Sequence, residues 1–334
     1  MESTSFQLST KFILPEDKRP QLSKASTLHT IPIIDMNQEP SLLVQNLSQA
    51  CEEYGFFQII NHGVPNELCQ KMMTTLSEFF ALSSQEKAQF FTTDLTKQVK
   101  LFNYYLKLDT QEKVTMWSES FAHPWHPLED IIHLLPENPL QYREVFAAYA
   151  KEMRVLMRKL LRFVSQGLGL EMDCLEKILG LEPALNYQAN HYPPCPDPEL
   201  TLGLPAHTDI VALTILLQSE GVTGLQVIKD GNWVSVDPVP NAFVINLGDQ
   251  IQVLSNGRYK SVHHRAMTNN RQSRISVAMF YRPNSDVVIG PIEDMIDDEH
   301  PPLYRNYYIW EFMEEFRRQE GTRRRVKETF ELRH

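Results

Sequence analysis

A long run of short, largely apolar segments divided by turn residues extends from residue 184 to residue 281, and several of them alternate hydrophobic with polar residues. Strand side chains alternate between two faces, so a period of two predicts strands, whereas a helix has a period near 3.6. The predicted strands cover residues 184–192, 213–218, 224–228, 233–236, 242–246, 250–254, 262–268 and 274–281. Asp230-Gly231, between two of them, is typical of a tight hairpin. Strands in such number without intervening helices predict a closed or sandwiched antiparallel sheet, a jelly roll.

Helical spacing of apolar residues appears before this region and again after it. It covers residues 41–54, 66–82 and 139–169, and later 308–318. Ser83 and Glu86 have the spacing of a helix-capping box. The predicted fold class is therefore α+β: a double-stranded β-helix (jelly roll) core with an N-terminal helical and strand extension and a long supporting helix.

Four regions of the chain are predicted. They are a flexible N-terminal arm at 1–29, an N-terminal helical region at 30–183, the jelly-roll core at 184–290, and a C-terminal helix and tail at 291–334. Within the second region, residues 92–136 carry many aromatic residues without a clear period. Long irregular excursions in compact domains tend to be functional, so this one is interpreted as a cover over an apolar ligand. Ordinary surface packing explains part of the same pattern.

Composition excludes several classes of function. The net charge of −10 argues against a nucleic-acid partner, which would need a basic surface. Four cysteines without Cys-x-x-Cys spacing favour free thiols in a reducing compartment. No apolar run approaches the roughly 20 residues that span a bilayer, and the first residues contain no signal-peptide core. We expect a monomeric cytosolic protein, with a share in the nucleus and no membrane partner.

His207, Asp209 and His264 form the most informative pattern in the chain. Two histidines and one carboxylate on one face of a metal ion leave adjacent coordination positions open, which suits non-haem Fe(II). If His207 and Asp209 lie on one extended strand, their side chains point the same way and can reach one ion. A lone histidine is more often a surface or hydrogen-bonded core residue. The ordered set, in a strand-like apolar setting, predicts a metal site.

Arg274 and Ser276 lie at alternate positions of the last predicted strand. A guanidinium group offers a planar fork of donors, and a hydroxyl adds another, so the pair can hold a small carboxylate. The sequence therefore predicts a site for a carboxylate cosubstrate on the sheet that carries the metal.

These motifs and several others resemble one family. The resemblance rests on 31–35 (IPIID), 55–64 (GFFQIINHGV), 190–196 (NHYPPCP), 203–209 (GLPAHTD), 246–249 (NLGD), 254–257 (LSNG) and 259–266 (YKSVHHRA). Together they are similar to the plant Fe(II)/2-oxoglutarate-dependent dioxygenases, and in particular to the specialised-metabolism branch with the downy-mildew-resistance-like, salicylate-hydroxylating oxygenases. The resemblance covers roughly residues 30–320.

The resemblance implies a ligand set and a reaction. It assigns iron to His207, Asp209 and His264, and 2-oxoglutarate to Asn190, Tyr192, Arg274 and Ser276. O2 would take the remaining iron position, and ascorbate would serve as reductant. Decarboxylation of 2-oxoglutarate to succinate and CO2 would leave a ferryl oxidant that attacks a substrate C–H bond.

The substrate chamber is predicted from position. Phe280 shares a strand face with Arg274 and Ser276 by even spacing, and the aromatic excursion supplies the cover. The predicted substrate-contacting residues are Phe102, Asn103, Phe121 and Phe280. The expected substrate is a small, largely apolar metabolite of phenolic, flavonoid or alkaloid type. Hydroxylation, desaturation and ring closure use the same iron site, so the sequence leaves all three open.

A second class of function is a catalytically retired metal-binding jelly roll that acts as a sensor or interaction protein. The intact metal triad and the Arg274-x-Ser276 pair favour the enzyme, because a retired barrel has no need for a carboxylate fork. A zinc hydrolase is disfavoured, since no general base lies at metalloprotease spacing.

Overall fold

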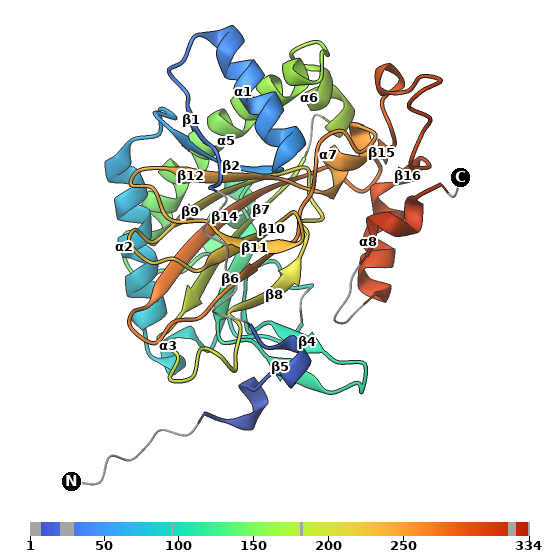
Figure 1. Ribbon diagram of the computed structural model, residues 1–334. Coiled ribbons are helices and arrows are strands. Elements are labelled where there is room, and N and C mark those ends of the chain that lie inside the picture. The colour runs from blue at the N-terminus through green and yellow to red at the C-terminus, as the bar shows by residue number, and fades with distance from the viewer. Residues whose placement is uncertain (1–7, 21–29, 95, 181–182, 320–324, 333–334) are drawn as a thin grey trace, which may run out of the picture.

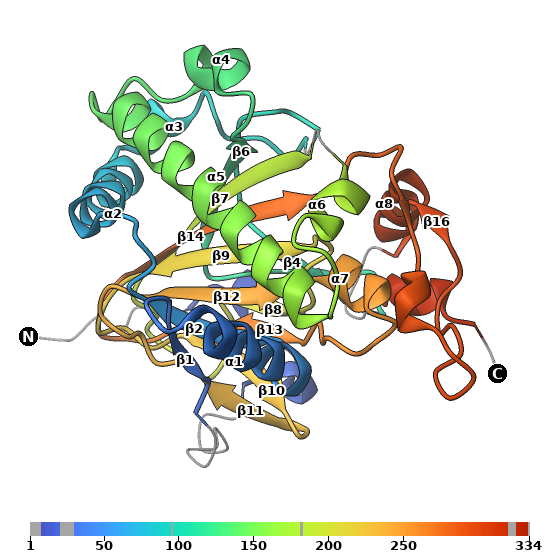
Figure 2. The same ribbon diagram turned by 90° about the horizontal axis from the view of Figure 1, so that it is seen from above.

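Two facing β-sheets with helices over the larger one make up the protein (Figures 1 and 2). The computed structural model describes residues 8–20, 30–94, 96–180, 183–319 and 325–332. The α+β jelly-roll prediction is confirmed. None of the helices in these ranges has both the length and the apolar character needed to cross a membrane.

The larger sheet has eight strands in the order β1-β2-β12-β9-β14-β7-β6-β3. Their bounds are β1 Ile33–Asp35, β2 Phe56–Ile60, β12 Phe243–Leu247, β9 Leu213–Gln218, β14 Arg274–Arg282, β7 Ala184–Tyr192, β6 Glu119–Pro124 and β3 Lys100–Phe102. Four of these strands come from the predicted N-terminal helical region. That region is therefore part of the barrel wall rather than only a helical support.

The smaller sheet has four strands in the order β11-β10-β13-β8. Their bounds are β11 Asn232–Ser235, β10 Leu225–Lys229, β13 His264–Ala266 and β8 Leu204–His207. The hairpin predicted at Asp230-Gly231 joins β10 to β11, and both turn residues have positive φ (50° and 77°). Two strand pairs stand apart from these sheets: β4 Tyr105–Lys107 with β5 Lys113–Thr115, and β15 Val288–Ile289 with β16 Tyr307–Tyr308.

Helices cover the face of the larger sheet that points away from the smaller sheet (Figure 2). This layer consists of α1 Pro40–Glu53, α2 Asn66–Ala81 and α5 Tyr142–Gly167, with α6 Cys174–Leu179 against α5. The other helices are α3 Ser84–Lys87, α4 Leu128–Ile131, α7 Asp249–Leu254 and α8 Ile309–Arg318, and α8 lies beside β16, away from this layer (Figure 2). The long helix α5 buries one apolar side, from Tyr142 through Met153 to Val164, in the main core. The capping box of Ser83 and Glu86 is present at the start of α3. This layer leaves the other face of the sheet free to build a site.

The prediction of a strand over residues 250–254 is wrong, because this stretch is the helix α7. The N–H of Ser255 donates to the Ile251 carbonyl (2.9 Å), one turn back. Ile251, Val253 and Leu254 are all buried. A short, fully buried apolar run has no exposed face, so its periodicity does not separate helix from strand.

Part of the predicted flexible arm is packed against the domain. Leu14 is fully buried, and its N–H donates to the Leu200 carbonyl (2.9 Å). The Phe12 ring lies 4.8 Å from the Trp117 ring. The prediction is therefore wrong for residues 8–20, where apolar side chains are removed from water. The remainder of the arm, 1–7 and 21–29, lies outside the described residues.

Candidate metal and cosubstrate site

Strands β8 and β13 bring the two predicted histidine ligands together. His207 is the last residue of β8, His264 is the first of β13, and they are directly paired in the antiparallel register. Asp209 lies beyond the end of β8, so strand alternation does not orient it as predicted. Instead its backbone carbonyl accepts a hydrogen bond from the N–H of Asp249 (2.8 Å). A loop held by α7 therefore presents the carboxylate.

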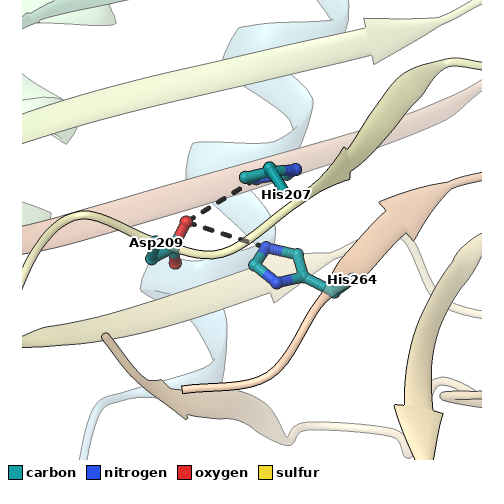
Figure 3. Close-up of side chains that lie close together, drawn as sticks. All are labelled: His207, Asp209 and His264. Atoms are coloured by element: carbon teal, nitrogen blue, oxygen red, sulfur yellow. Dashed lines mark ion pairs between the residues drawn. The ribbon is translucent and has the colours of Figure 1, made fainter. Parts of the chain in front are cut away.

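The three side chains converge on one point (Figure 3). Asp209 Oδ1 lies 3.6 Å from His207 Nε2 and 3.7 Å from His264 Nε2. One ligand atom from each of the three residues lies within 4.8 Å of the others. This spacing can accommodate an ion, and a two-histidine, one-carboxylate set is the donor set of non-haem Fe(II) oxygenases.

Both histidines are oriented by hydrogen bonds to the backbone. His207 Nδ1 lies 2.8 Å from the Pro205 carbonyl, and His264 Nδ1 lies 3.2 Å from the Val262 carbonyl. A carbonyl oxygen only accepts, so each Nδ1 carries the proton and each Nε2 is left as a lone-pair donor for the metal. Burial lowers the pKa of His264 to about 4, which keeps this ring neutral and able to bind a metal at neutral pH.

The second oxygen of Asp209 is held by two donors. The Thr214 hydroxyl donates to Oδ2 (2.6 Å), as does Asn246 Nδ2 (2.7 Å). Burial alone would raise the pKa of Asp209, but His264, His207 and these hydrogen bonds lower it below its ordinary value. The carboxylate is therefore ionised, with Oδ1 turned toward the histidines.

Replacing Thr214 by valine tests this orientation, because valine keeps the shape and removes the donor. Loss of one such partner is expected to weaken metal affinity by about 10- to 100-fold. The measurement is a Co(II) titration of both proteins. Thr201→Val is a matched control, since Thr201 is also buried and hydrogen-bonded, to Thr268 (2.9 Å), but does not contact Asp209. Equal Co(II) affinity in wild type and Thr214→Val would contradict the role given to Thr214.

The four predicted cosubstrate residues lie on two neighbouring strands. In the register of β7 and β14, Arg274 pairs with Tyr192, and Ser276 pairs with Asn190. Directly opposed residues share a face, so the four side chains form one patch. Ser276 also pairs with Gln218 of β9, which by strand alternation shares a face with Thr214, the hydrogen-bond partner of Asp209, so this patch lies on the inner face of the sheet. All four residues are buried.

The guanidinium of Arg274 is buried and is bonded to an uncharged side chain. Arg274 is 2% exposed, its Nη2 donates to Gln218 Oε1 (2.8 Å), and its guanidinium lies 5.2 Å from the Tyr192 ring. Its Nε is buried without an acceptor, and none of the described carboxylates forms an ion pair with it. A Cβ at position 224 would lie 2.9 Å from the Arg274 side chain, so glycine at this position leaves room for the arginine. A buried cation with an unused donor fits a carboxylate ligand.

The predicted substrate residues separate into two groups. Phe280 pairs with Thr214 across β14 and β9, which places its ring on the face that holds Asp209. Phe102 pairs with Ser120, on the same inner face, and is buried. Asn103 is exposed, and its amide donates to the Ser118 carbonyl (2.6 Å).

Phe121 does not line this chamber, so that prediction is corrected. It is fully buried on the opposite face of β6, where its ring lies 4.6 Å from Phe79 of α2 and 6.0 Å from Tyr142 of α5. Ser120, the residue before it, is the one that points inward. A shift of one residue along a strand exchanges the two faces.

Several contributing residues were missed by sequence reasoning. They are Thr214 and Asn246 on Asp209, Gln218 on Arg274, and Ser120 on Asn190. Each is a polar residue that shares a strand face with the site. A polar residue on the buried face of a strand is unusual, and strand alternation could have marked these positions from the sequence.

Comparison with known proteins agrees with this geometry. Residues 184–283 match the 2OG-Fe(II) oxygenase superfamily, and residues 31–145 match the N-terminal region of non-haem dioxygenases in morphine synthesis. The chain is 42% identical to Protein DOWNY MILDEW RESISTANCE 6 of Arabidopsis thaliana, over 94% of this chain and 93% of that protein. The chain belongs to the 2OG-Fe(II) oxygenase family. It is a 2-oxoglutarate-dependent dioxygenase.

Two further relatives extend the comparison of this 2OG-Fe(II) oxygenase. It is 40% identical to Flavanone 3-dioxygenase 2 of Oryza sativa subsp. japonica, over 92% of this chain and 90% of that one. The crystal structure of JOX2 in complex with 2OG, Fe and JA superposes with a TM-score of 0.88 at 34% identity, covering 99% of this chain and 96% of that chain. The structural comparison therefore agrees with the family that the sequence comparisons show.

Proposed function

We propose that this oxygenase hydroxylates, desaturates or cyclises a small, largely apolar plant metabolite, with release of succinate and CO2. His207, Asp209 and His264 would hold Fe(II), and Arg274 and Ser276 would hold the far carboxylate of 2-oxoglutarate. When bound, the iron and 2-oxoglutarate supply the oxidising chemistry. The observation that carries the proposal is the buried guanidinium of Arg274, which pairs with none of the described carboxylates, on the sheet face that faces the metal cluster.

The remaining cosubstrate contacts are assigned to Asn190 and Tyr192. Asn190 Oδ1 already accepts from Ser120 (2.8 Å) and from Gln188 Nε2 (2.9 Å), so its own amide N–H groups are directed elsewhere. This arrangement supports donation by Asn190 to a ligand oxygen. The Tyr192 ring covers one side of the Arg274 guanidinium and limits its contact with water.

The substrate would lie against Phe280 and Phe102, beside the metal cluster. Both are aromatic residues on the inner face, which supports a flat or apolar substrate. The names of the relatives point to different substrates, a flavanone for one, and the JOX2 crystal contained JA. A plant metabolite of phenolic, flavonoid or alkaloid type is therefore proposed as a class. Asn103 is proposed only as a rim residue of this chamber.

Incubation of Fe(II)-loaded protein with 2-oxoglutarate and a fractionated plant metabolite extract tests the proposal. Mass spectrometry should reveal products that are heavier by one oxygen atom or lighter by two hydrogen atoms. Those products should be missing when 2-oxoglutarate is left out. The retired-barrel alternative instead expects metal binding with no succinate from any fraction.

Truncation of Phe280 to alanine is expected to loosen the substrate. Loss of stacking should weaken binding of an aromatic substrate by about 0.5–1.5 kcal/mol. A less restrained substrate also lets 2-oxoglutarate be consumed without matching product, so the succinate-to-product ratio should rise above one. Phe163→Ala is the control, because Phe163 packs from α5 against the core on the other side of the sheet. A ratio that stays at one in Phe280→Ala would place the chamber elsewhere.

Other properties of the oxygenase stay predictions. They are the monomeric state, the cytosolic location with a share in the nucleus, and ascorbate as reductant. Gel filtration with light scattering addresses the first, and an assay with and without ascorbate the last.

A further inference from the structure

The helix α7 lies beside the C-terminal part of the chain (Figure 1), and its first turn is hydrogen-bonded to residues 208–212, here called the metal-binding loop. On the loop side, the N–H of Asp249 donates to the Asp209 carbonyl (2.8 Å), and that of Gly248 donates to the Ala212 carbonyl (2.9 Å). A Cβ on Gly248 would collide with the Val211 carbonyl, so this approach requires glycine. The loop that presents Asp209 is therefore built directly on α7.

On the other side, a buried ion pair links α7 to residues 325–332, here called the C-terminal segment. Lys327 Nζ lies 3.0 Å from Asp249 Oδ1, and the two side chains are 11% and 3% exposed. The second oxygen of Asp249 accepts from the Thr208 hydroxyl (3.2 Å). Thr208 stands between the metal ligands His207 and Asp209. One carboxylate thus joins the C-terminal segment to the metal-binding loop.

A second chain of hydrogen bonds runs parallel to the first. The Tyr307 hydroxyl donates to Gln250 Oε1 (2.8 Å), and Gln250 Nε2 donates to the Ile210 carbonyl (2.9 Å). Ile210 directly follows Asp209. The Phe330 ring of the C-terminal segment packs 4.2 Å from the Tyr307 ring. Both chains therefore depend on the same docked segment.

The C-terminal segment docks through two buried apolar residues, Val326 and Phe330, and through side-chain and backbone hydrogen bonds. The Arg305 N–H donates to the Phe330 carbonyl (2.9 Å), and the Leu332 N–H donates to the Leu303 carbonyl (2.8 Å). If the segment leaves, the buried Asp249 carboxylate loses its cation, which is costly in a dry environment. Asp249 and Thr208 would then rearrange, and the loop between the two ligands would lose its support.

We propose that docking of the C-terminal segment and metal binding stabilise each other, with Lys327 and Asp249 as positioning residues. The proposal rests on the metal site described above. It gives the C-terminal segment a role in assembling the site from outside the barrel. Because coupling between two equilibria is reciprocal, a segment that favours metal binding must itself be held more firmly once metal is bound.

The test uses full-length protein and Co(II) as the metal probe. Lys327→Met is expected to bind Co(II) about 10-fold more weakly, as found for residues that support metal ligands. Lys87→Met is the matched control, because it removes another buried lysine whose ion pair, with Glu119 (2.7 Å), involves neither α7 nor the C-terminal segment. In wild-type protein, hydrogen exchange at Leu332 and Arg305 should slow by about the same factor when Co(II) is added.

Each outcome decides the proposal. Weaker Co(II) binding in Lys327→Met alone, with metal-dependent protection of the C-terminal amides, supports it. Unchanged Co(II) affinity in a folded Lys327→Met protein overturns the coupling but leaves the metal site intact. If Lys327→Met does not fold, the hydrogen-exchange experiment on wild-type protein decides alone. Exchange at Leu332 and Arg305 that does not change when Co(II) is added overturns the coupling. Failure of wild-type protein to bind Co(II) at all overturns the metal site as well.

Discussion

Replacing Asp209 by asparagine is expected to abolish turnover of 2-oxoglutarate while the protein stays folded. The amide oxygen can still accept from Thr214 and Asn246, which hold Oδ2 at 2.6 and 2.7 Å in the native protein. The NH2 group, which cannot bind a metal, would then replace Oδ1. Mutation of a residue that only supports a ligand lowers metal affinity by about 10- to 100-fold, so loss of the ligand itself should lower metal affinity by more than that.

Succinate release and Fe(II) affinity are the measurements for Asp209→Asn, with circular dichroism to verify folding. Asp237→Asn is the control, because Asp237 is an exposed carboxylate that accepts from Thr223 (2.8 Å) away from the cluster. Wild-type rates of succinate release in Asp209→Asn would remove this residue from the metal site.

Replacing Arg274 by lysine is expected to raise KM for 2-oxoglutarate by about 10-fold or more, taking roughly 1.5–3 kcal/mol for a charged hydrogen bond. Lysine keeps the charge but offers a point donor in place of the planar fork. It also leaves the Oε1 of Gln218 without its partner at 2.8 Å. The effect should fall on KM for 2-oxoglutarate rather than on metal affinity, because Arg274 does not contact the cluster.

Arg265→Lys is a matched control for that substitution. Arg265 is also buried, donates to Gln226 (2.9 Å) and stacks over the Trp233 ring (4.0 Å), but it lies on the face of β13 opposite His264. Both variants lose a fork, a glutamine contact and an aromatic contact. A KM for 2-oxoglutarate that is equal in Arg274→Lys and Arg265→Lys would show that Arg274 does not hold the cosubstrate.

The parts of the fold that followed from the sequence are those set by local alternation. The strands at Ala184–Tyr192 and Leu213–Gln218 were predicted with the bounds that the structure has, because each has a regular period or β-branched and aliphatic content between turn residues. The helix α7 was not, since its buried apolar residues fit either structure. The residue before it, Gly248, approaches the Val211 carbonyl so closely that no larger residue fits, and that contact is not visible in the sequence.

The metal ligands were predictable because an ordered set of two histidines and one carboxylate is a rare sequence pattern. The residues that orient these ligands form no such pattern. Nothing in the local sequence joins Lys327 to Asp249, or Thr214 to Asp209, because the pairings are made by the tertiary fold. Phe121 was predicted as a substrate residue because it is aromatic, and that prediction is wrong. On β6 it is Ser120 that points toward the site, so the next residue, Phe121, points to the opposite face and packs in the helix-covered core.

The central claim is that His207, Asp209 and His264 form an iron site that drives oxidation by 2-oxoglutarate and O2. The most direct test is succinate release by the metal-free protein after it is loaded with Fe(II) or with Co(II), in the presence of the plant metabolite extract. We predict succinate with Fe(II) only, together with a product carrying one added oxygen atom or two fewer hydrogen atoms. Succinate formed equally with Co(II), or none from Fe(II)-loaded protein with any fraction, would contradict the claim.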